Sequence, residues 1–323
     1  MAHYKVVAVN RGYETYQFER DILEPMGAEL VLTAEDCTAE DQVIKAAQDA
    51  DAVLVREAPI GQRVIEAFQR CRIIARYGVG VDNVDLQTAR KRKIYVSNVP
   101  DYGTEDVSDH AVALLLACIR QLPLRDRNLR RGIFESDIRD EIYRTTGKTL
   151  GLVGYGKIAR AFHRKWRGFL PGRVLVCDPF VTAEVIRANE AEKVDLDTLL
   201  AASDYITLHT PLTPESRHII DAAALTKMKK TAILVNTSRG AVVDETALVT
   251  ALRNGQILAA GLDVFEKEPL GQDHPLVALP NVILTSHVAW YSKDSVQELQ
   301  TRAAQEVRRV LAGERPVCWV NPW

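Results

Sequence analysis

Three side chains in the C-terminal half of the chain have the types needed to donate a proton to a carbonyl and to bind a carboxylate. Arg239, Glu268 and His287 each follow an apolar run typical of a buried strand, at residues 232–235, 257–261 and 282–284 respectively. Histidine titrates near neutral pH, and a neighbouring carboxylate fixes its tautomer. Arginine binds carboxylate in a bidentate way. Beside a hydride-carrying cofactor, this set could reduce a 2-keto acid.

A second pattern, at residues 149–178, predicts where such a cofactor binds. An apolar run is followed by Gly154-Tyr155-Gly156-Lys157-Ile158-Ala159, a helical pattern, a second apolar run and Asp178. Gly154 permits a tight turn, and Gly156 lets the backbone approach a pyrophosphate at a helix N-terminus. Asp178 can accept hydrogen bonds from a ribose diol and would repel a 2′-phosphate, so the pattern favours NAD over NADP.

The alternation of strand and helix patterns along the chain predicts an α/β protein with two doubly wound parallel-sheet domains, which must position these residues. Residues 4–98 alternate strands and helices and lack a glycine fingerprint after the first strand, so we expect a flavodoxin-like, five-stranded substrate domain here. We expect residues 1–99 and 292–323 to form this domain. Residues 100–291 should form a Rossmann NAD-binding domain with six or seven strands. The amphipathic pattern at 292–312 predicts a helix that returns to the first domain.

Composition excludes several classes of function. The chain has 323 residues, a net charge of −2 and 47% hydrophobic residues, which indicates a globular protein with no electrostatic reason to bind nucleic acid or a membrane. Five scattered cysteines and the absence of a signal-peptide pattern favour the cytoplasm. The histidines and cysteines show no metal-ligand spacing, so no metal is expected.

One predicted helix, at residues 105–121, is apolar on nearly all sides. A helix of this kind needs more cover than one sheet face supplies, so we expect it at a domain or subunit interface, typical of a homodimer. The charged segment that follows, at residues 122–146, fits a solvated helix or an interface loop better than a phosphate site.

Four further motifs give the chain a family resemblance. They lie at residues 77–85 (YGVGVDNVD), 236–240 (NTSRG), 262–269 (LDVFEKEP) and 281–287 (NVILTSH). With the glycine turn, they resemble the D-isomer-specific 2-hydroxyacid dehydrogenase family over nearly the whole chain. The resemblance implies an NAD(H)-dependent oxidoreductase that interconverts a 2-keto acid and a D-2-hydroxy acid.

The resemblance also implies individual roles. Arg239, Glu268 and His287 would be catalytic, with His287 as the acid and base, and the backbone N–H groups of Val79 and Gly80 would bind the substrate carboxylate. The implied NAD contacts are Tyr155, Gly156, Lys157, Ile158, Asp178, His209, Thr210, Pro211, Thr237, Ser238, Arg239, Asp263, His287, Ala289 and Trp290.

Within the family, Trp290 makes the segment after His287 look most like the C-terminal-binding-protein branch. Trp290 would then wall the substrate pocket and favour an apolar keto acid over a phosphorylated one; packing at a hinge is the alternative. Ser286 departs from the family, which usually has proline there, and its freer backbone could loosen the loop of His287. Arg56 could select the far end of the substrate, or it could pair internally with Glu57.

Two other functions compete with keto-acid reduction. A corepressor-like protein would sense NAD and bind partner peptides with little turnover, but binding alone does not need the Arg239, Glu268 and His287 set. Oxidation of an inorganic or one-carbon acid such as phosphite or formate is the third possibility, and Trp290 argues mildly against it.

Overall fold

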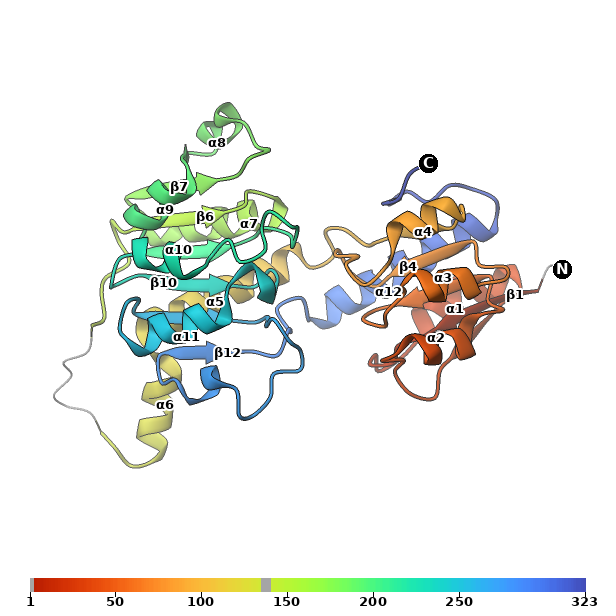
Figure 1. The fold of residues 1–323 in the computed structure, drawn as a ribbon, viewed down its shortest axis with the longest axis horizontal. Coiled ribbons are helices and arrows are strands. Elements are labelled where there is room, and N and C mark those ends of the chain that lie inside the picture. The colour runs from red at the N-terminus through yellow and green to blue at the C-terminus, as the bar shows by residue number, and fades with distance from the viewer. Residues whose placement is uncertain (1–2, 135–140) are drawn as a thin grey trace. The chain divides into compact units, whose positions relative to one another are not determined.

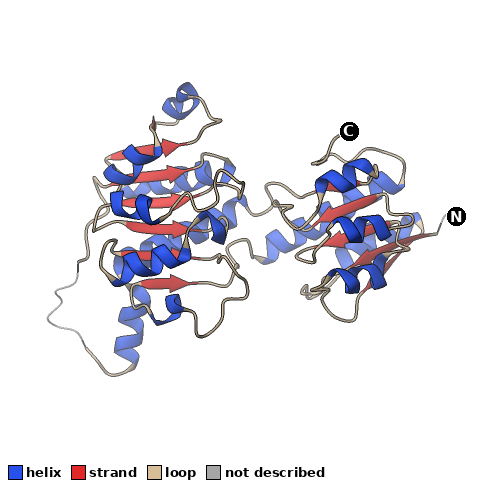
Figure 2. Cartoon of the chain, in the orientation of Figure 1, coloured by secondary structure: helices blue, strands red, loops and turns tan. Residues whose placement is uncertain are grey.

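The computed structural model describes residues 3–134 and 141–323, which form two compact units (Figure 1). Unit 1 contains the residues up to Gly103 together with Ser292–Trp323, and unit 2 is the continuous segment Thr104–Tyr291. The structure thus keeps Pro100 with unit 1, whereas the sequence placed the first boundary just before it. Both units are parallel sheets covered by helices, as Figure 2 shows, and the predicted fold class is confirmed.

Unit 1 is built on a five-stranded parallel sheet with the order β2-β1-β3-β4-β5. Its strands are β1 (Tyr4–Ala8), β2 (Ala28–Leu32), β3 (Ala52–Val55), β4 (Ile73–Arg76) and β5 (Tyr95–Ser97). Its helices are α1 (Gln17–Leu23), α2 (Glu40–Ala47), α3 (Gln62–Ala67), α4 (Leu86–Lys91) and α12 (Lys293–Leu311), with a 3-10 turn at Glu24–Met26. All four residues of β3 are fully buried, because helices cover both faces of the sheet.

Two C-terminal segments complete unit 1. Helix α12 starts at the N-cap Ser292, whose side chain accepts a hydrogen bond from the backbone N–H of Ser295, and it packs on α1 and β4. Beyond it, Trp319 forms an antiparallel bridge to Ser97 at the end of β5, and Asn321 Oδ1 accepts a hydrogen bond from Val96 N at 2.8 Å.

Unit 2 is built on a seven-stranded parallel sheet with the order β12-β11-β10-β9-β6-β7-β8. Its strands are β6 (Thr149–Val153), β7 (Arg173–Cys177), β8 (Glu192–Lys193), β9 (Tyr205–Leu208), β10 (Ile233–Asn236), β11 (Ala259–Leu262) and β12 (Val282–Leu284). Its helices are α5 (Thr104–Arg120), α6 (Leu122–Arg130), α7 (Lys157–Trp166), α8 (Ala183–Ala188), α9 (Leu196–Ala202), α10 (Ala222–Lys227) and α11 (Glu245–Arg253), with 3-10 turns at Arg167–Phe169, Gly240–Val242 and Pro275–Ala278. The chain leaves β6 toward β7 and returns on its other side at β9, so the strand order reverses beside β6, where such sheets bind ligands at their carboxyl ends.

Helix α5 packs on α7, β10 and β11 through one buried face that includes Ala111, Leu115 and Cys118. The opposite side stays open in this chain, since Ala113 is exposed and Leu116 is only half-buried. The charged segment after α5 does begin with a helix, α6, while residues 135–140 lie outside the described part.

In the described part of the chain, no single helix has both the length and the apolar composition needed to cross a bilayer. Helices α5 and α6, which meet at a bend of 60°, pass that test of length and composition only when taken as a pair.

Candidate active site

The loop that follows β12 carries His287 and is anchored by one buried carboxylate, Asp263. The Asp263 oxygens accept hydrogen bonds from Val288 N at 3.0 Å and Ala289 N at 2.9 Å, and Thr285 Oγ1 donates to Oδ1 at 2.6 Å. The backbone N–H of His287 donates to the carbonyl of Asp263 at 2.7 Å. Because Asp263 is only 1% exposed, each lost bond would leave a buried polar group unsatisfied. The imidazole therefore stands on a fixed loop.

This anchoring bears on the serine that replaces the proline expected before His287. Ser286 is exposed, and His287 has a left-handed backbone with φ 54°, a conformation that non-glycine residues adopt only when their surroundings impose it. The bonds from Asp263 supply that constraint, and none of them uses the side chain of residue 286.

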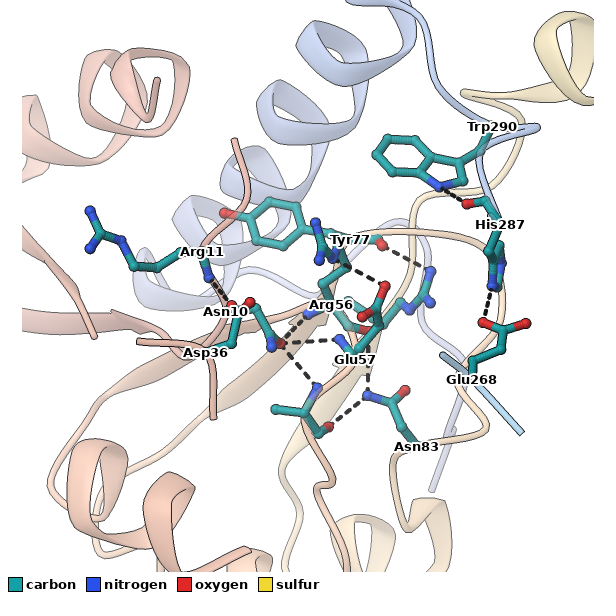
Figure 3. A network of polar contacts seen from close by, with 12 residues as sticks. Asn10, Arg11, Asp36, Arg56, Glu57, Tyr77, Asn83, Glu268, His287 and Trp290 are labelled. Atoms are coloured by element: carbon teal, nitrogen blue, oxygen red, sulfur yellow. Dashed lines mark hydrogen bonds and ion pairs between the residues drawn. The ribbon is translucent and has the colours of Figure 1, made fainter. Parts of the chain in front are cut away.

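The imidazole of His287 pairs with Glu268, as Figure 3 shows. His287 Nδ1 lies 2.7 Å from Glu268 Oε2, and Phe265 N donates to Glu268 Oε1 at 3.0 Å. Burial raises the pKa of Glu268, but the hydrogen bonds from His287 and Phe265 N and the charge of Arg239 outweigh it and hold this pKa below its ordinary value. Glu268 is therefore a carboxylate at neutral pH, and Nε2 of His287 is the ring atom left to exchange a proton.

Arg239 lies on the loop that follows β10. At the next residue, Gly240, this loop packs closely against the segment that leads to Glu268. A Cβ atom on Gly240 would overlap the backbone carbonyl of Phe265, so only glycine allows this approach. Asn236 Nδ2 donates to the Arg239 carbonyl at 2.8 Å and fixes the loop. The structure thus brings Arg239, Glu268 and His287 together on three neighbouring strand ends.

The glycine turn after β6 has the form needed for a pyrophosphate. Gly154 has φ +87°, and a Cβ there would come within 2.8 Å of the carbonyl oxygen of His209. Gly156 is the N-cap of α7, and nothing lies within 4 Å of the Cβ that it lacks. Lys157 and Ile158 are the first two residues of α7, so the free space beside Gly156 lies at the positive end of the helix dipole.

Asp178 ties the turn to the end of β7. Its Oδ2 accepts a hydrogen bond from Tyr155 N at 2.7 Å, and its Oδ1 accepts from Phe180 N at 2.8 Å and Val181 N at 2.9 Å. A carboxylate oxygen has more than one acceptor site, so Asp178 can also receive the hydroxyl groups of a ribose.

The other predicted cofactor residues lie on loops at the same edge of the sheet. His209, Thr210 and Pro211 follow β9, and Thr237 and Ser238 follow β10. Thr237 Oγ1 is a buried hydroxyl with no hydrogen-bond partner among the described residues, as expected of a group that a ligand satisfies. Burial lowers the pKa of His209 to about 3, so its ring is neutral. The open space at Gly156, the Asp178 carboxylate and the Thr237 hydroxyl together fit a dinucleotide.

Trp290 is held on the loop of His287 itself. Its indole Nε1 donates to the His287 carbonyl at 2.9 Å (Figure 3). Its ring meets the ring of Tyr291 edge-on. The indole therefore moves with the His287 loop, which is compatible both with a pocket wall and with hinge packing.

In unit 1, the predicted carboxylate-binding loop follows β4. Gly78 has φ +141°, and its carbonyl accepts a hydrogen bond from Val99 N at 2.9 Å. Asn98 Nδ2 donates to the Val79 carbonyl at 2.7 Å, while the Val79 side chain is 48% exposed. The carbonyl groups of the loop are thus fixed, which orients the backbone of Val79 and Gly80.

Residues 112–289 match the model of a family described as D-isomer specific 2-hydroxyacid dehydrogenase, NAD binding domain. The chain belongs to this family. A glyoxylate reductase from Korarchaeum cryptofilum is 41% identical over 86% of this chain and 85% of its own length. A D-3-phosphoglycerate dehydrogenase from Methanocaldococcus jannaschii is 37% identical over 91% of this chain, which spans 55% of that longer protein.

Solved structures agree with the family. The TT0316 protein from Thermus thermophilus superposes with a TM-score of 0.90 at 33% identity, covering 98% of this chain and 99% of that one. D-lactate dehydrogenase from Aquifex aeolicus, solved with NAD and lactic acid, gives a TM-score of 0.85 at 26% identity over 96% of both chains.

The protein is therefore an NAD-dependent D-2-hydroxyacid dehydrogenase that interconverts 2-keto and 2-hydroxy acids, and the corepressor-like alternative is not favoured. Its assignment to the C-terminal-binding-protein branch stays a prediction.

The sequence did not reveal how Asp263 acts in this dehydrogenase. It was expected only as a cofactor contact, yet it is the anchor of the His287 loop. The signal lies in the register: Leu262 pairs with Leu284, which places Asp263 beside Thr285. Sequence patterns indicate strands but not which of their residues lie side by side.

Proposed function

We propose that this dehydrogenase reduces a small 2-keto acid, with His287 as the proton donor and Arg239 as the group that binds the substrate carboxylate and polarises the ketone. The supporting observation is the 2.7 Å contact between His287 Nδ1 and Glu268. Because Nδ1–H donates to a carboxylate, the protonated ring presents Nε2–H to a carbonyl oxygen. NADH, when bound, supplies the hydride that the carbonyl carbon receives.

The same proposal assigns the cofactor contacts. The pyrophosphate would lie at the N-terminus of α7, at residues 155–158, and the adenosine ribose at Asp178. The loops at 209–211 and 237–239, with Asp263, Ala289 and Trp290, would contact the rest of NAD. The unsatisfied hydroxyl of Thr237 and the open space at Gly156 support this arrangement.

For the substrate, we assign Val79 and Gly80 to the carboxylate and Arg56 to the far end. Arg56 Nε lies 3.3 Å from Glu57 Oε1, so the internal ion pair considered from the sequence is present. The Glu57 side chain is 69% exposed, and such exposed pairs contribute only ~0–1 kcal/mol, so the pair does not prevent a substrate contact.

We further propose a homodimer in the cytoplasm. The half-exposed face of α5 would form the interface between subunits, and the five cysteines, all free thiols here, suit a reducing compartment. Sedimentation equilibrium with an α5 variant, Leu116→Glu, tests the dimer: the variant should be monomeric while the wild type is not.

The catalytic assignment is tested with glyoxylate, pyruvate, 4-methyl-2-oxopentanoate and phosphohydroxypyruvate, assayed for NADH oxidation, with NADPH as the comparison. On the best substrate, His287→Asn and Arg239→Ala should lower kcat/KM by ~10²–10⁴-fold, the range expected for acid–base catalysis. The Kd for NADH should stay within a few-fold of wild type. Near wild-type turnover by either variant would refute the role of that residue.

A further inference from the structure

The turn that carries Arg56 is held by a single buried side chain from another strand. Asn10 Oδ1 accepts hydrogen bonds from three consecutive backbone N–H groups, those of Arg56 at 3.0 Å, Glu57 at 3.1 Å and Ala58 at 3.0 Å (Figure 3). Asn10 follows β1, the neighbour of β3 in the sheet, and is 5% exposed. Three donors saturate one amide oxygen, so this turn has little freedom to change its backbone.

Asn10 is itself fixed on both sides. Tyr16 donates its hydroxyl to the Asn10 carbonyl at 2.9 Å, and the backbone N–H of Arg11 donates to Asp36 Oδ1. The segment after β1 is therefore held by its own hydrogen bonds, independently of the turn at residues 56–58.

A second asparagine holds the same turn through its carbonyl groups. Asn83 Nδ2 donates to the Ala58 carbonyl at 2.8 Å and, more weakly, to the Arg56 carbonyl at 3.4 Å. Asn83 belongs to the segment that continues from Val79 and Gly80. The two proposed substrate-contacting segments of unit 1 are thus joined through hydrogen bonds.

The guanidinium of Arg56 also depends on the segment after β1. Gly12 has φ +118°, and a Cβ there would come within 2.6 Å of Arg56 Nη1, so the glycine leaves the space that the guanidinium occupies. The Arg56 side chain is 21% exposed, and its Nε atom, which makes no hydrogen bond within the described residues, lies 3.3 Å from the Glu57 carboxylate. A rigid backbone and a confined side chain give Arg56 one preferred position, which lowers the entropy cost of binding an anion.

We propose that Asn10 is a positioning residue for substrate specificity: it fixes the Arg56 turn so that the guanidinium selects 2-keto acids with a second anionic group at the far end. This inference rests on the proposed substrate role of Arg56, and it departs from the preference for apolar keto acids that the sequence analysis expected from Trp290. It adds a residue that is predicted to touch neither substrate nor cofactor and to act only through the turn at residues 56–58.

The test compares two substrates with an anionic far end, phosphohydroxypyruvate and 2-oxoglutarate, with two that lack it, pyruvate and 2-oxopentanoate. In the wild type, at least one anionic substrate should have the lower KM. Asn10→Ala should raise the KM for the anionic substrates by about tenfold relative to the neutral ones, with kcat little changed.

A double-mutant cycle separates positioning from general loosening. In the Arg56→Ala background, Asn10→Ala should add almost nothing to the KM for the anionic substrates. A full additive effect, or an equal loss for neutral and anionic substrates, overturns the proposal, and so does a wild type that prefers neither anionic substrate. Wild-type kcat for the neutral substrates and an unchanged circular-dichroism spectrum report that unit 1, which contains Asn10, is folded. If Asn10→Ala does not fold, Asn10→Ser, whose hydroxyl is too short to reach the turn, takes its place.

Different results would contradict the substrate role of Arg56 and the positioning role of Asn10. If Arg56→Ala leaves the anionic-to-neutral KM ratio unchanged, the substrate role of Arg56 is wrong and this inference fails with it. If Arg56→Ala changes the ratio and Asn10→Ala does not, only the role of Asn10 is wrong. Neither result affects the assignment of His287 and Arg239.

Discussion

The imidazole of His287 and the carboxylate of Glu268 lie 2.7 Å apart although 19 positions separate them in the chain and they follow different strands. Parallel pairing of β11 with β12 makes this possible, because the loops that follow both strands emerge at the same edge of the sheet. Everything that holds those two loops in place should therefore affect catalysis.

Replacing Asp263 with Asn should slow turnover without touching the acid–base pair itself. An amide presents N–H where a carboxylate oxygen now accepts from Val288 or Ala289, so one buried bond is lost at a cost of ~1–3 kcal/mol in stability and the His287 loop shifts. We expect a drop in kcat of at least tenfold, measured with the best keto acid. Thr285→Val is the matched control: it removes the hydroxyl that bonds to Asp263 and to His110 but leaves the bonds from Val288 N and Ala289 N, so it should have a smaller effect. An unchanged kcat in Asp263→Asn contradicts the anchoring role.

The two glycines of the nucleotide turn should respond differently to the same substitution. Gly154→Ala places a side chain at φ +87° against the His209 carbonyl, so the melting temperature should fall. Gly156→Ala enters open space, so the melting temperature should hold while the Kd for NADH rises, because the methyl group occupies the approach of the pyrophosphate. Differential scanning fluorimetry and NADH titration measure the two effects. Wild-type NADH affinity in Gly156→Ala would show that the pyrophosphate binds elsewhere.

Removing the charge of Asp178 should relax the choice of cofactor. Asp178→Asn keeps the shape of the side chain but no longer repels a 2′-phosphate. The ratio of kcat/KM with NADPH to kcat/KM with NADH should rise about tenfold, which corresponds to ~1.4 kcal/mol. Using the ratio cancels any general loosening of the turn at Tyr155. A ratio equal to that of the wild type would argue against a ribose contact at this residue.

The buried ring of His209 should make the fold less stable as the pH is lowered. Burial depresses its folded-state pKa from 6.5 to about 3, so between these values the unfolded chain binds the extra proton and unfolding becomes easier as pH falls. The urea midpoint of the wild type should therefore decline in that window more steeply than that of His209→Gln. Thr207→Val, which removes the hydroxyl that lies 3.0 Å from His209 Nε2 but keeps the titrating ring, should follow the wild-type slope. Equal slopes in wild type and His209→Gln would show that the ring is not titrating as described.

Much of this arrangement could be predicted from the residues alone. The apolar runs at 52–55 and 282–284 coincide with β3 and β12, because strands of a parallel sheet covered by helices are continuous apolar segments. Strand β12, at the edge of its sheet, is only half-buried. Arg239, Glu268 and His287 were found by the same rule, since each follows such a run. Strand β8 was not predicted: it has only two residues, Glu192 and Lys193, both exposed, and carries no apolar pattern.

The supporting residues were beyond sequence reasoning for a different reason. A single asparagine after β1 gives no signal of its own, and its donors lie 46 to 48 positions away. Which backbone groups meet Asn10 or Asp263 depends on strand order and register, and composition and periodicity do not encode either directly.

The division of the chain has a consequence for the order of events during its synthesis. Unit 1 takes its strands from residues that precede unit 2, but it also requires α12 and the pairing of Asn321 with Val96, which are translated after unit 2. Unit 2 is encoded without interruption from Thr104 to Tyr291. The half of the enzyme that binds the nucleotide is therefore the first that can complete its fold, although it is the second to be translated.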